Sequence, residues 1–495
     1  MTPSSKEGQG ISENLKKDSY FMPIQDNICF IGTVDIDNQF KSFGLLQEDR
    51  RRHVYVLGKS GMGKSTMLEN MILQDIYSGQ GVCFLDPLGD SAESILDQIP
   101  RYRQNDVIYF NPADTQNPIG LNMLESTGDA DFLIASSLMT VLKRLWEGTW
   151  SARMEYILNN TILLLLETPG STLIGIIKLL TDKGFRDGLV SNCKNILVKN
   201  FWEQEFPKFS EKYQSEAIAP ILNKVGQFFS TSMIRNILGQ SRSTINFRDI
   251  MDSKKILIAN LAKGKIGEDN SSLLGSMLVT KFQLAAMSRT NIPENQRSDF
   301  FLYVDEFQNF ITDSFVTILS EARKYRLCLT IAHQYIAQLN SEDSERIKDA
   351  IFGNVGTIVT FRVGADDSEV LEKELQPVLK ESFLKLDRGQ IIVKLSISNR
   401  TLNPFVALTL PPIYASIRGS KKYLEDFSKH TWGVPKDRVE QEINAFFAQG
   451  LIFDKNTGGV LPTKKKRTRN KKSKVQDSSI GTDQNSTKKV VANTP

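Results

Sequence analysis

The sequence has few cysteines and histidines and no long apolar run. Only 4 cysteines and 3 histidines occur in 495 residues, and the cysteines are scattered without the close pairs that bind zinc. We therefore expect a reducing environment and no zinc site or histidine cluster. No stretch reaches the roughly 18 consecutive apolar residues of a membrane span, and the polar residues 1–20 lack the apolar core of a signal peptide. These absences predict a cytoplasmic protein with no integral membrane segment of its own.

Charge is distributed unevenly along the chain. The formal net charge is +4, but residues 464–495 contain ten Lys or Arg against two Asp, a net +8, which leaves −4 for the rest because 4 minus 8 is −4. We expect a disordered basic tail over residues 461–495 that contacts nucleic acid or anionic lipid through non-specific electrostatics. A solubilising tail without a partner, or a nuclear import signal, would have the same composition.

The strongest motif is a phosphate-binding loop. The apolar run Val54–Leu57 leads into "GKSGMGKS", which matches the Walker A pattern G-x-x-x-x-G-K-[ST]. Its glycines allow a tight turn whose N–H groups surround phosphate oxygens, while the following helix points its positive dipole end at the same anion. The predicted nucleotide-binding residues are Gly58, Lys59, Ser60, Gly61, Met62, Gly63, Lys64, Ser65 and Thr66.

Two residues of this loop have separate expected roles. Lys64 should contact the β- and γ-phosphates of ATP, and Ser65 should bind Mg²⁺. The alternative is a Gly/Ser-rich turn without a ligand. The strand before the loop and the amphipathic helix after it favour nucleotide binding, because the loop needs both to work.

A second motif, "FFLYVDEFQNF" at residues 300–310, ends an apolar run on two adjacent carboxylates. Burying Asp305 and Glu306 without a nearby cation would cost free energy. A magnesium ion at the phosphate loop would supply that cation: Asp305 is expected to orient the Mg²⁺ shell and Glu306 to polarise the attacking water. The alternative is that these acids face solvent or pair with lysine. Their occurrence with a phosphate loop favours an ATP hydrolase.

Continuous apolar runs predict the fold class. They are "GVCFLDP", "DVIYFNP", "KKILIANL", "FFLYVDE", "LCLTIAHQ" and "VGTIVTFRV". Such runs indicate strands covered on both faces, as in a mostly parallel sheet flanked by helices. Because other strands separate the phosphate loop from Asp305, the order fits the additional-strand, catalytic-glutamate branch of P-loop ATPases.

Domain boundaries follow from changes in periodicity. Helical patterns dominate residues 121–245, which predicts an all-α insertion between sheet strands. We expect an α/β motor domain over 46–120 and 246–412, preceded by an N-terminal extension over residues 1–45. A helical segment is expected over 413–460, before the tail.

Six stretches in this order resemble the TraG/TraD-type ATPases of type IV secretion and conjugation, within the larger HerA and FtsK group of DNA-pumping motors. They are "DRRRHVYVLGKSGMGKSTMLENMI", "FLDPLGD", "ANLAKGKIGEDNSSLLGSMLVTKFQLAAM", "FFLYVDEFQNF", "LSEARKYRLCLTIAHQYIAQL" and "FGNVGTIVTFRVGADD", and they cover most of residues 45–375. The resemblance implies a RecA-like motor domain with a helical insertion, assembled as a ring, expected to be a hexamer, that threads DNA through its centre using ATP.

The resemblance also implies two further site residues. Gln334, at the end of "TIAHQ", looks like the sensor of the γ-phosphate. Arg323, in "EARKYR", is similar to the arginine finger that a neighbouring subunit inserts to stabilise transition-state charge. Arg326 or Arg362 could take this role instead.

The expected function is therefore that of an oligomeric Mg²⁺-dependent ATPase that binds and translocates DNA, as in type IV coupling proteins. Members of this family usually begin with transmembrane helices, and none is expected here, so the chain would dock on a membrane-bound secretion partner or act in the cytoplasm. The alternatives are a HerA-like translocase in repair or segregation, a secretion ATPase that moves protein, and an ATP-gated DNA-binding scaffold.

Overall fold

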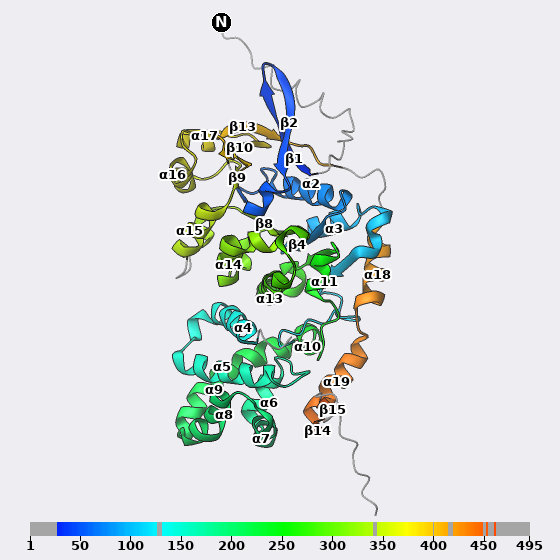
Figure 1. Ribbon diagram of the computed structural model, residues 1–495, viewed down its shortest axis with the longest axis vertical. Coiled ribbons are helices and arrows are strands. Elements are labelled where there is room, and N and C mark those ends of the chain that lie inside the picture. Colours follow the sequence, from blue (N-terminus) through cyan, green and yellow to red (C-terminus); the bar gives the residue numbers. More distant parts are fainter. Residues whose placement is uncertain are drawn as a thin grey trace, which may run out of the picture.

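The computed structural model describes residues 27–125, 131–339, 344–398, 400–413 and 419–448, and the backbone of 452–453 and 460–461. The predicted basic tail lies outside these ranges except for its first residue. A sheet flanked by helices occupies the upper half of the molecule in Figure 1, and a group of helices occupies the lower half.

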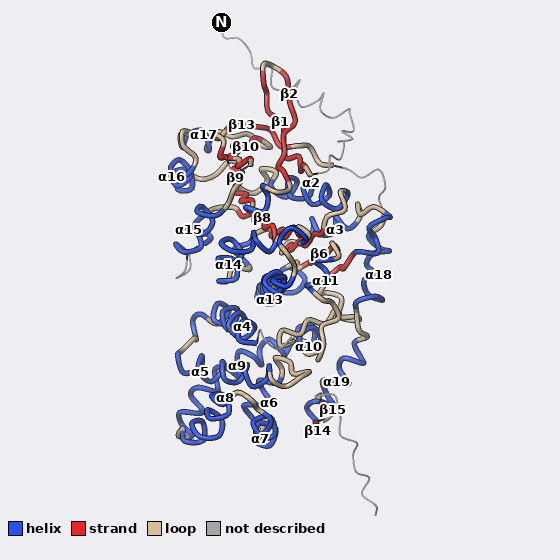
Figure 2. The backbone as a smooth tube through the Cα atoms, viewed as in Figure 1, coloured by secondary structure: helices blue, strands red, loops and turns tan. Residues whose placement is uncertain are grey.

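An 11-stranded sheet has the order β2-β1-β13-β10-β9-β3-β8-β7-β4-β6-β5 (Figure 2). The strands from β9 to β5 in this order are parallel, and they are β3 (Val54–Leu57), β4 (Gly81–Asp86), β5 (Val107–Phe110), β6 (Ile256–Asn260), β7 (Phe300–Val304), β8 (Leu327–His333) and β9 (Thr357–Thr360). The other four pair antiparallel, and they are β1 (Ile28–Ile36), β2 (Gln39–Leu46), β10 (Gln390–Lys394) and β13 (Phe405–Thr409).

All residues of the seven parallel strands are buried, as their continuous apolarity predicts. Alternate residues of β3 face opposite layers. Val54 and Val56 pack with helices α2 (Lys64–Tyr77) and α3 (Asp90–Leu96). Tyr55 belongs to the other core layer, which is covered by α13 (Glu268–Met287), α14 (Asp313–Glu321) and α15 (Ser344–Asn354). The predicted α/β fold with a mostly parallel sheet is confirmed.

The stretch expected to be an N-terminal extension contributes two strands to the sheet. Strand β1 pairs with β13, with Gly32 opposite Thr409, and β2 forms the outer edge. A Cβ at Gly32 would lie 2.4 Å from the carbonyl oxygen of Leu408, so the close pairing requires glycine here. Residues 39–42 of β2 are exposed, and this half-solvated hairpin lacks the apolar run that identifies the central strands.

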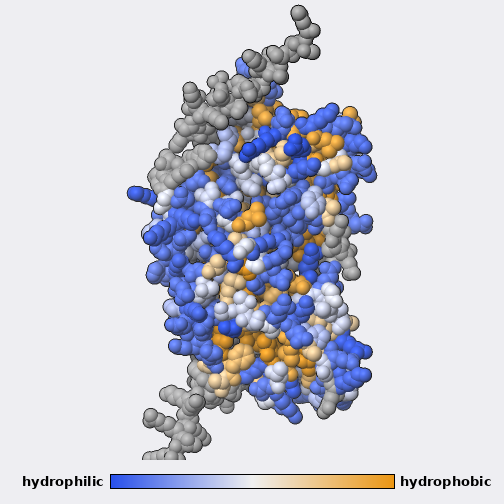
Figure 3. Space-filling model, turned by 180° about the vertical axis from the view of Figure 1, so that it is seen from behind, coloured by the Kyte–Doolittle hydropathy of each residue, from blue (hydrophilic) through white to orange (hydrophobic). Residues whose placement is uncertain are grey.

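Eight α-helices lie between β5 and β6 among the described residues: α11 (Phe247–Asp252), which leads directly into β6, and seven that precede it. The seven are α4 (Asp131–Leu145), α5 (Ala152–Leu166), α6 (Gly175–Thr181), α7 (Lys183–Asn192), α8 (Ile196–Asn200), α9 (Glu211–Ser230) and α10 (Ser232–Leu238). Helix α4 packs on α13 beneath the sheet. Figure 3, seen from behind, shows a mostly hydrophilic face with a broad hydrophobic area low on the molecule, where these helices lie. No described helix is both long and apolar enough to cross a bilayer.

The segment after the sheet runs beside both halves of the molecule (Figure 1). Helix α18 (Lys421–Trp432) covers the edge strand β5: the Tyr109 N–H donates to the Ser428 hydroxyl at 2.8 Å, and the indole of Trp432 donates to the Val107 carbonyl at 3.1 Å. These bonds satisfy backbone groups that an edge strand leaves unpaired. Helix α19 (Lys436–Ala448) contacts α10, where Asn236 donates to Glu440 at 3.2 Å.

A buried ion pair joins the helix after the phosphate loop to the strand that carries Asp305. Arg50, in the 3-10 turn η1 (Asp49–Arg52), donates two hydrogen bonds to Asp75 of α2, at 2.7 and 2.8 Å. Tyr303 of β7 donates to the same carboxylate at 2.6 Å, and the guanidinium lies 3.8 Å from the centre of the Phe301 ring. Arg50 and Asp75 are only 2% and 3% exposed.

We predict that Arg50→Met lowers the free energy of unfolding by about 3 kcal/mol, because the Asp75 carboxylate stays buried without its partner. Urea denaturation measures the loss. Arg438→Met is the control, because it breaks the exposed Arg438–Glu442 pair and should cost about 1 kcal/mol or less. Equal losses in both variants would contradict the assignment.

Candidate nucleotide-binding site

The phosphate loop connects β3 to α2 and has the backbone that an anion site requires. Gly63, with φ of 114°, precedes the helix in a left-handed conformation that favours glycine. A Cβ at Gly58 would lie 2.4 Å from the Cβ of Phe361 on the neighbouring chain segment. The first turn of α2 has no acidic residue and no side-chain cap, so its N–H groups are available to phosphate oxygens.

Lys64 folds back over this loop. Its ammonium donates to the carbonyl oxygens of Gly58 at 2.6 Å and Lys59 at 3.2 Å. Burial lowers the pKa of Lys64, and the carboxylates of Glu306 and Asp305 act in the opposite direction. Lys64 is 6% exposed, so its positive charge is buried at the loop.

Strand order brings the second motif to the loop. Because β8 lies between β3 and β7, the carboxyl ends of these three parallel strands meet at one edge of the sheet. The Ser65 hydroxyl donates to Asp305 Oδ2 at 3.4 Å. The other oxygen of Asp305 accepts from the Glu306 N–H at 2.9 Å. The strand between β3 and β7 is the additional strand that the sequence order predicts.

The acids at this edge are buried close together. Asp305 is 3% exposed and Glu306 is 8% exposed. Burial, followed by the carboxylates of Glu306 and Asp86, raises the pKa of Asp305 to about 7. Burial is the larger cause, and the two neighbouring carboxylates add to it because each opposes ionisation of the others.

Asp86 is a residue of this edge that our sequence analysis did not select. It ends β4, and its carboxylate accepts from the N–H groups of Leu88 and Ala92, both at 2.9 Å. These bonds fix the start of α3. The available signal was an apolar run that ends on an acid in "FLDP", as "LYVDE" does.

Gln334 follows β8 and contacts the predicted catalytic base directly. Its amide donates to Glu306 Oε1 at 2.8 Å. Gln308, which sequence analysis did not select, donates to Glu306 Oε2 at 2.8 Å. Glu306 itself has φ of 44°, a left-handed conformation that is uncommon outside glycine and often marks functional sites.

Two of the three candidate arginines lie away from the site, and the third lies beside the phosphate loop. Arg323 and Arg326 precede β8, at the edge of the sheet opposite Gln334, and a strand of this length spans about 20 Å. Arg323 is exposed, whereas Arg326 is mostly buried and lies 3.6 Å from Asp299. Arg362 is exposed beside its own phosphate loop, where its carbonyl accepts from the Lys59 N–H at 2.8 Å. The structure therefore does not bring Arg323 to the site of its own chain.

The donor set fits a nucleotide with Mg²⁺. Unpaired N–H groups and Lys64 suit phosphate oxygens, while Ser65 and Asp305 offer the hydroxyl and carboxylate oxygens that Mg²⁺ prefers. Asp305 and Glu306 are buried side by side, and buried carboxylates are normally paired with a cation or bound to a metal, which supports a cation here.

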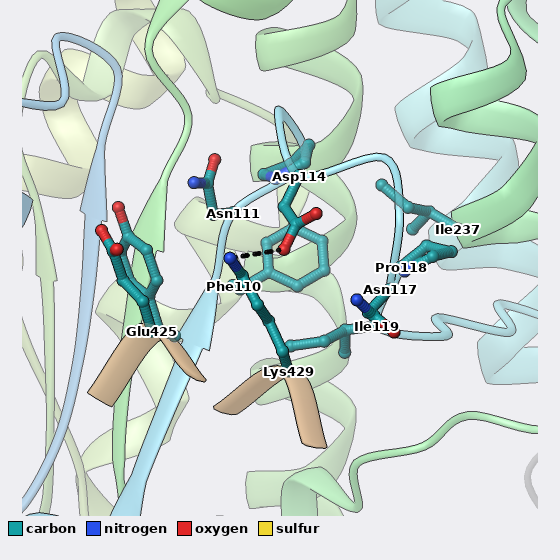
Figure 4. Close-up of a pocket in the computed structure, with 11 residues that line it drawn as sticks. Phe110, Asn111, Asp114, Asn117, Pro118, Ile119, Ile237, Glu425 and Lys429 are labelled. Atoms are coloured by element: carbon teal, nitrogen blue, oxygen red, sulfur yellow. Dashed lines mark ion pairs between the residues drawn. The ribbon is translucent and has the colours of Figure 1, made fainter. Parts of the chain in front are cut away.

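A separate cavity of about 100 Å³ lies at the end of β5 (Figure 4). It is bordered by the loop after β5 and by α18, whose Lys429 lies 3.3 Å from Asp114 of that loop. Strands β8, β7, β4 and β6 separate β5 from β3. This cavity is therefore distinct from the candidate nucleotide site, and the ion pair helps to fasten α18 to the sheet.

The fold and the site define a P-loop protein with a RecA-like sheet. The chain belongs to the family described as the type IV secretion-system coupling protein DNA-binding domain, whose model matches residues 40–374. The family predicted from the motifs is thus confirmed. No curated protein matches the chain significantly.

Solved structures of the conjugative coupling protein TrwB have the same fold. The unbound form of TrwBdeltaN70 is 16% identical, with a TM-score of 0.56 over 79% of this chain and 90% of that chain. TrwB with the ATP analogue ADPNP gives the same identity and TM-score over 79% and 91%. TrwB with ADP and Mg²⁺ again gives 16% and 0.56, over 79% and 92%.

Two substitutions separate nucleotide binding from chemistry. We predict that Lys64→Ala weakens ATP binding at least about 10-fold, because phosphate oxygens lose a charged partner. Glu306→Gln should keep ATP affinity within about 2-fold and lower kcat by about 100-fold or more, because it removes only the general base. Fluorescent-nucleotide titration and steady-state ATP turnover measure the two effects. If Glu306→Gln hydrolysed ATP at the parent rate, the base would be another residue.

Proposed function

We propose that this protein is an oligomeric Mg²⁺-dependent ATPase that binds and translocates DNA. The observation that carries the proposal is the meeting of Lys64 and Ser65 with Asp305, Glu306 and Gln334 at one sheet edge. Membership of a coupling-protein family described by its DNA-binding domain supports the DNA partner. The TrwB structures with an ATP analogue and with ADP and Mg²⁺ support the expected ligands.

In this proposal the phosphate loop binds the nucleotide through its N–H groups and Lys64. Ser65 and Asp305 would hold Mg²⁺, and this ion would supply positive charge opposite the phosphates. Glu306 accepts the proton of the attacking water. Gln334, hydrogen-bonded to Glu306 on the adjacent strand, senses the γ-phosphate. In each case the proposed role suits the chemistry of the side chain: an ammonium for phosphate, oxygens for Mg²⁺, and a carboxylate for a proton.

The active form is proposed to be a ring, expected to be a hexamer, with sites at subunit interfaces. Arg323 is exposed at the sheet edge opposite its own phosphate loop, which supports a role at a neighbouring site rather than at its own. Arg326 is the weaker candidate, because Asp299 already faces it at 3.6 Å. Arg362 would act within its own subunit, beside Lys59.

The proposed motor comprises residues 46–120 and 246–412, and the helices between them form the proposed insertion. Because the proposed site uses ATP, we propose that the protein acts in the cytoplasm. We also propose that it docks on a membrane-bound secretion partner. The basic tail over residues 461–495 would add non-specific affinity for DNA phosphates.

The test is ATP turnover by the purified protein without nucleic acid, with single-stranded DNA and with duplex DNA. We expect at least one form of DNA to raise kcat about 10-fold, because a translocase couples hydrolysis to its track. Glu306→Gln, assayed in parallel, subtracts contaminating ATPase. Robust turnover indifferent to DNA would favour a protein-secretion ATPase, and negligible turnover throughout would favour an ATP-gated scaffold.

A further inference from the structure

We propose that Gln308 is a positioning residue for Glu306, which it anchors through one carboxylate oxygen so that the other faces the attacking water. This inference rests on the proposed ATPase function and extends it to a residue outside the motifs that define the site. It follows from the way the Glu306 side chain is held in the structure.

Both oxygens of the Glu306 carboxylate accept a hydrogen bond from a different glutamine. Gln308 donates to Oε2 and Gln334 donates to Oε1, each at 2.8 Å. A long, flexible acidic side chain that is held at both oxygens has one orientation instead of many. The two glutamines therefore define where the base points.

The two glutamines differ in how they are attached to the chain. Gln308 lies two residues after Glu306 in the 3-10 turn η8 (Phe307–Asn309), so it moves together with the base. Gln334 follows a different strand, β8, and it can exchange Glu306 for another acceptor without disturbing the Glu306 backbone. In this proposal Gln308 keeps its hydrogen bond to Glu306 throughout, and Gln334 is the residue that can replace Glu306 with another acceptor.

The turn that carries Gln308 is itself firmly held. The Asn309 amide donates to the Glu306 carbonyl at 2.7 Å, and Lys263 donates to Asn309 at 2.5 Å. Phe307 is fully buried against Phe315 and His333. These contacts keep Glu306 in its left-handed conformation and fix the distance between Gln308 and the carboxylate.

The assignment of the two oxygens follows from this difference. Oε2 accepts from a donor on the same turn as Glu306, so we assign Oε1 as the oxygen that receives the water proton. Oε1 accepts from Gln334, the predicted sensor of the γ-phosphate, so a water held beside the γ-phosphate would reach Glu306 on that side. The carbonyl oxygen of the Gln308 amide has no hydrogen-bond partner among the described residues, so its amide nitrogen makes the bond that defines its role.

The test compares steady-state ATP turnover of the full chain with that of two variants of similar size. Gln308→Met removes the donor, and Gln308→Glu replaces it with an acceptor that repels Glu306. We expect kcat to fall about 10-fold in Gln308→Met and further in Gln308→Glu, while KM for ATP stays within about 2-fold. Gln283→Met, on α13 away from the site, is the control for a glutamine-to-methionine change in the core and should keep the parent kcat.

Thermal melting of all variants separates positioning from a structural role. A parent kcat in Gln308→Met would overturn the inference, and so would a joint fall of kcat, ATP affinity and melting temperature. An increased kcat would also overturn it, because Gln308 would then restrain the base. If the parent protein itself showed no ATP turnover with or without DNA, the proposed function would fail and the inference with it, whereas an active parent with an unaffected Gln308→Met rejects the inference alone.

Discussion

The candidate site depends on attraction between buried carboxylates and the cations placed opposite them. Asp305, Glu306 and Asp86 meet at the carboxyl edge of the parallel sheet, and the pKa of Asp305 rises to about 7 because burial and the two acids disfavour its charge. Lys64 opposes this shift, but it is itself buried and directed toward backbone carbonyls. A divalent cation with bound phosphates would neutralise the negative charge of these carboxylates. The carboxylates and the phosphate loop are therefore parts of one binding site.

The fold positions these groups through strand order and through the contacts beneath them. Strand β8 separates β3 from β7, so Gln334 is placed between the loop and the carboxylates. Near the C-terminal end of α2, Asp75 binds Arg50, which also contacts Tyr303 and so ties α2 to β7. The helix that begins at Lys64 and the strand that ends before Asp305 are thus fixed relative to each other.

The sequence predicted those parts of the site that depend on local motifs. The parallel strands were recognisable because each is a continuous apolar run, and Lys64, Ser65, Asp305 and Glu306 stand at fixed offsets from such runs. Strands β1 and β2 were missed because much of their surface is exposed. The contact of Gln308 with Glu306 was missed because it depends on the conformation of two side chains in a turn. The role of Arg323 involves a second subunit, so a single chain leaves it a prediction.

The central claim is that the carboxylate edge and the phosphate loop form one Mg²⁺-nucleotide site. Calorimetric titration of the protein with ATP, in Mg²⁺ and in EDTA, tests it most directly, with Asp305→Asn as the variant. The account predicts that Mg²⁺ strengthens ATP binding at least about 10-fold in the parent protein, and that Asp305→Asn loses most of this gain. Equal ATP affinity with and without Mg²⁺ in the parent protein would contradict it.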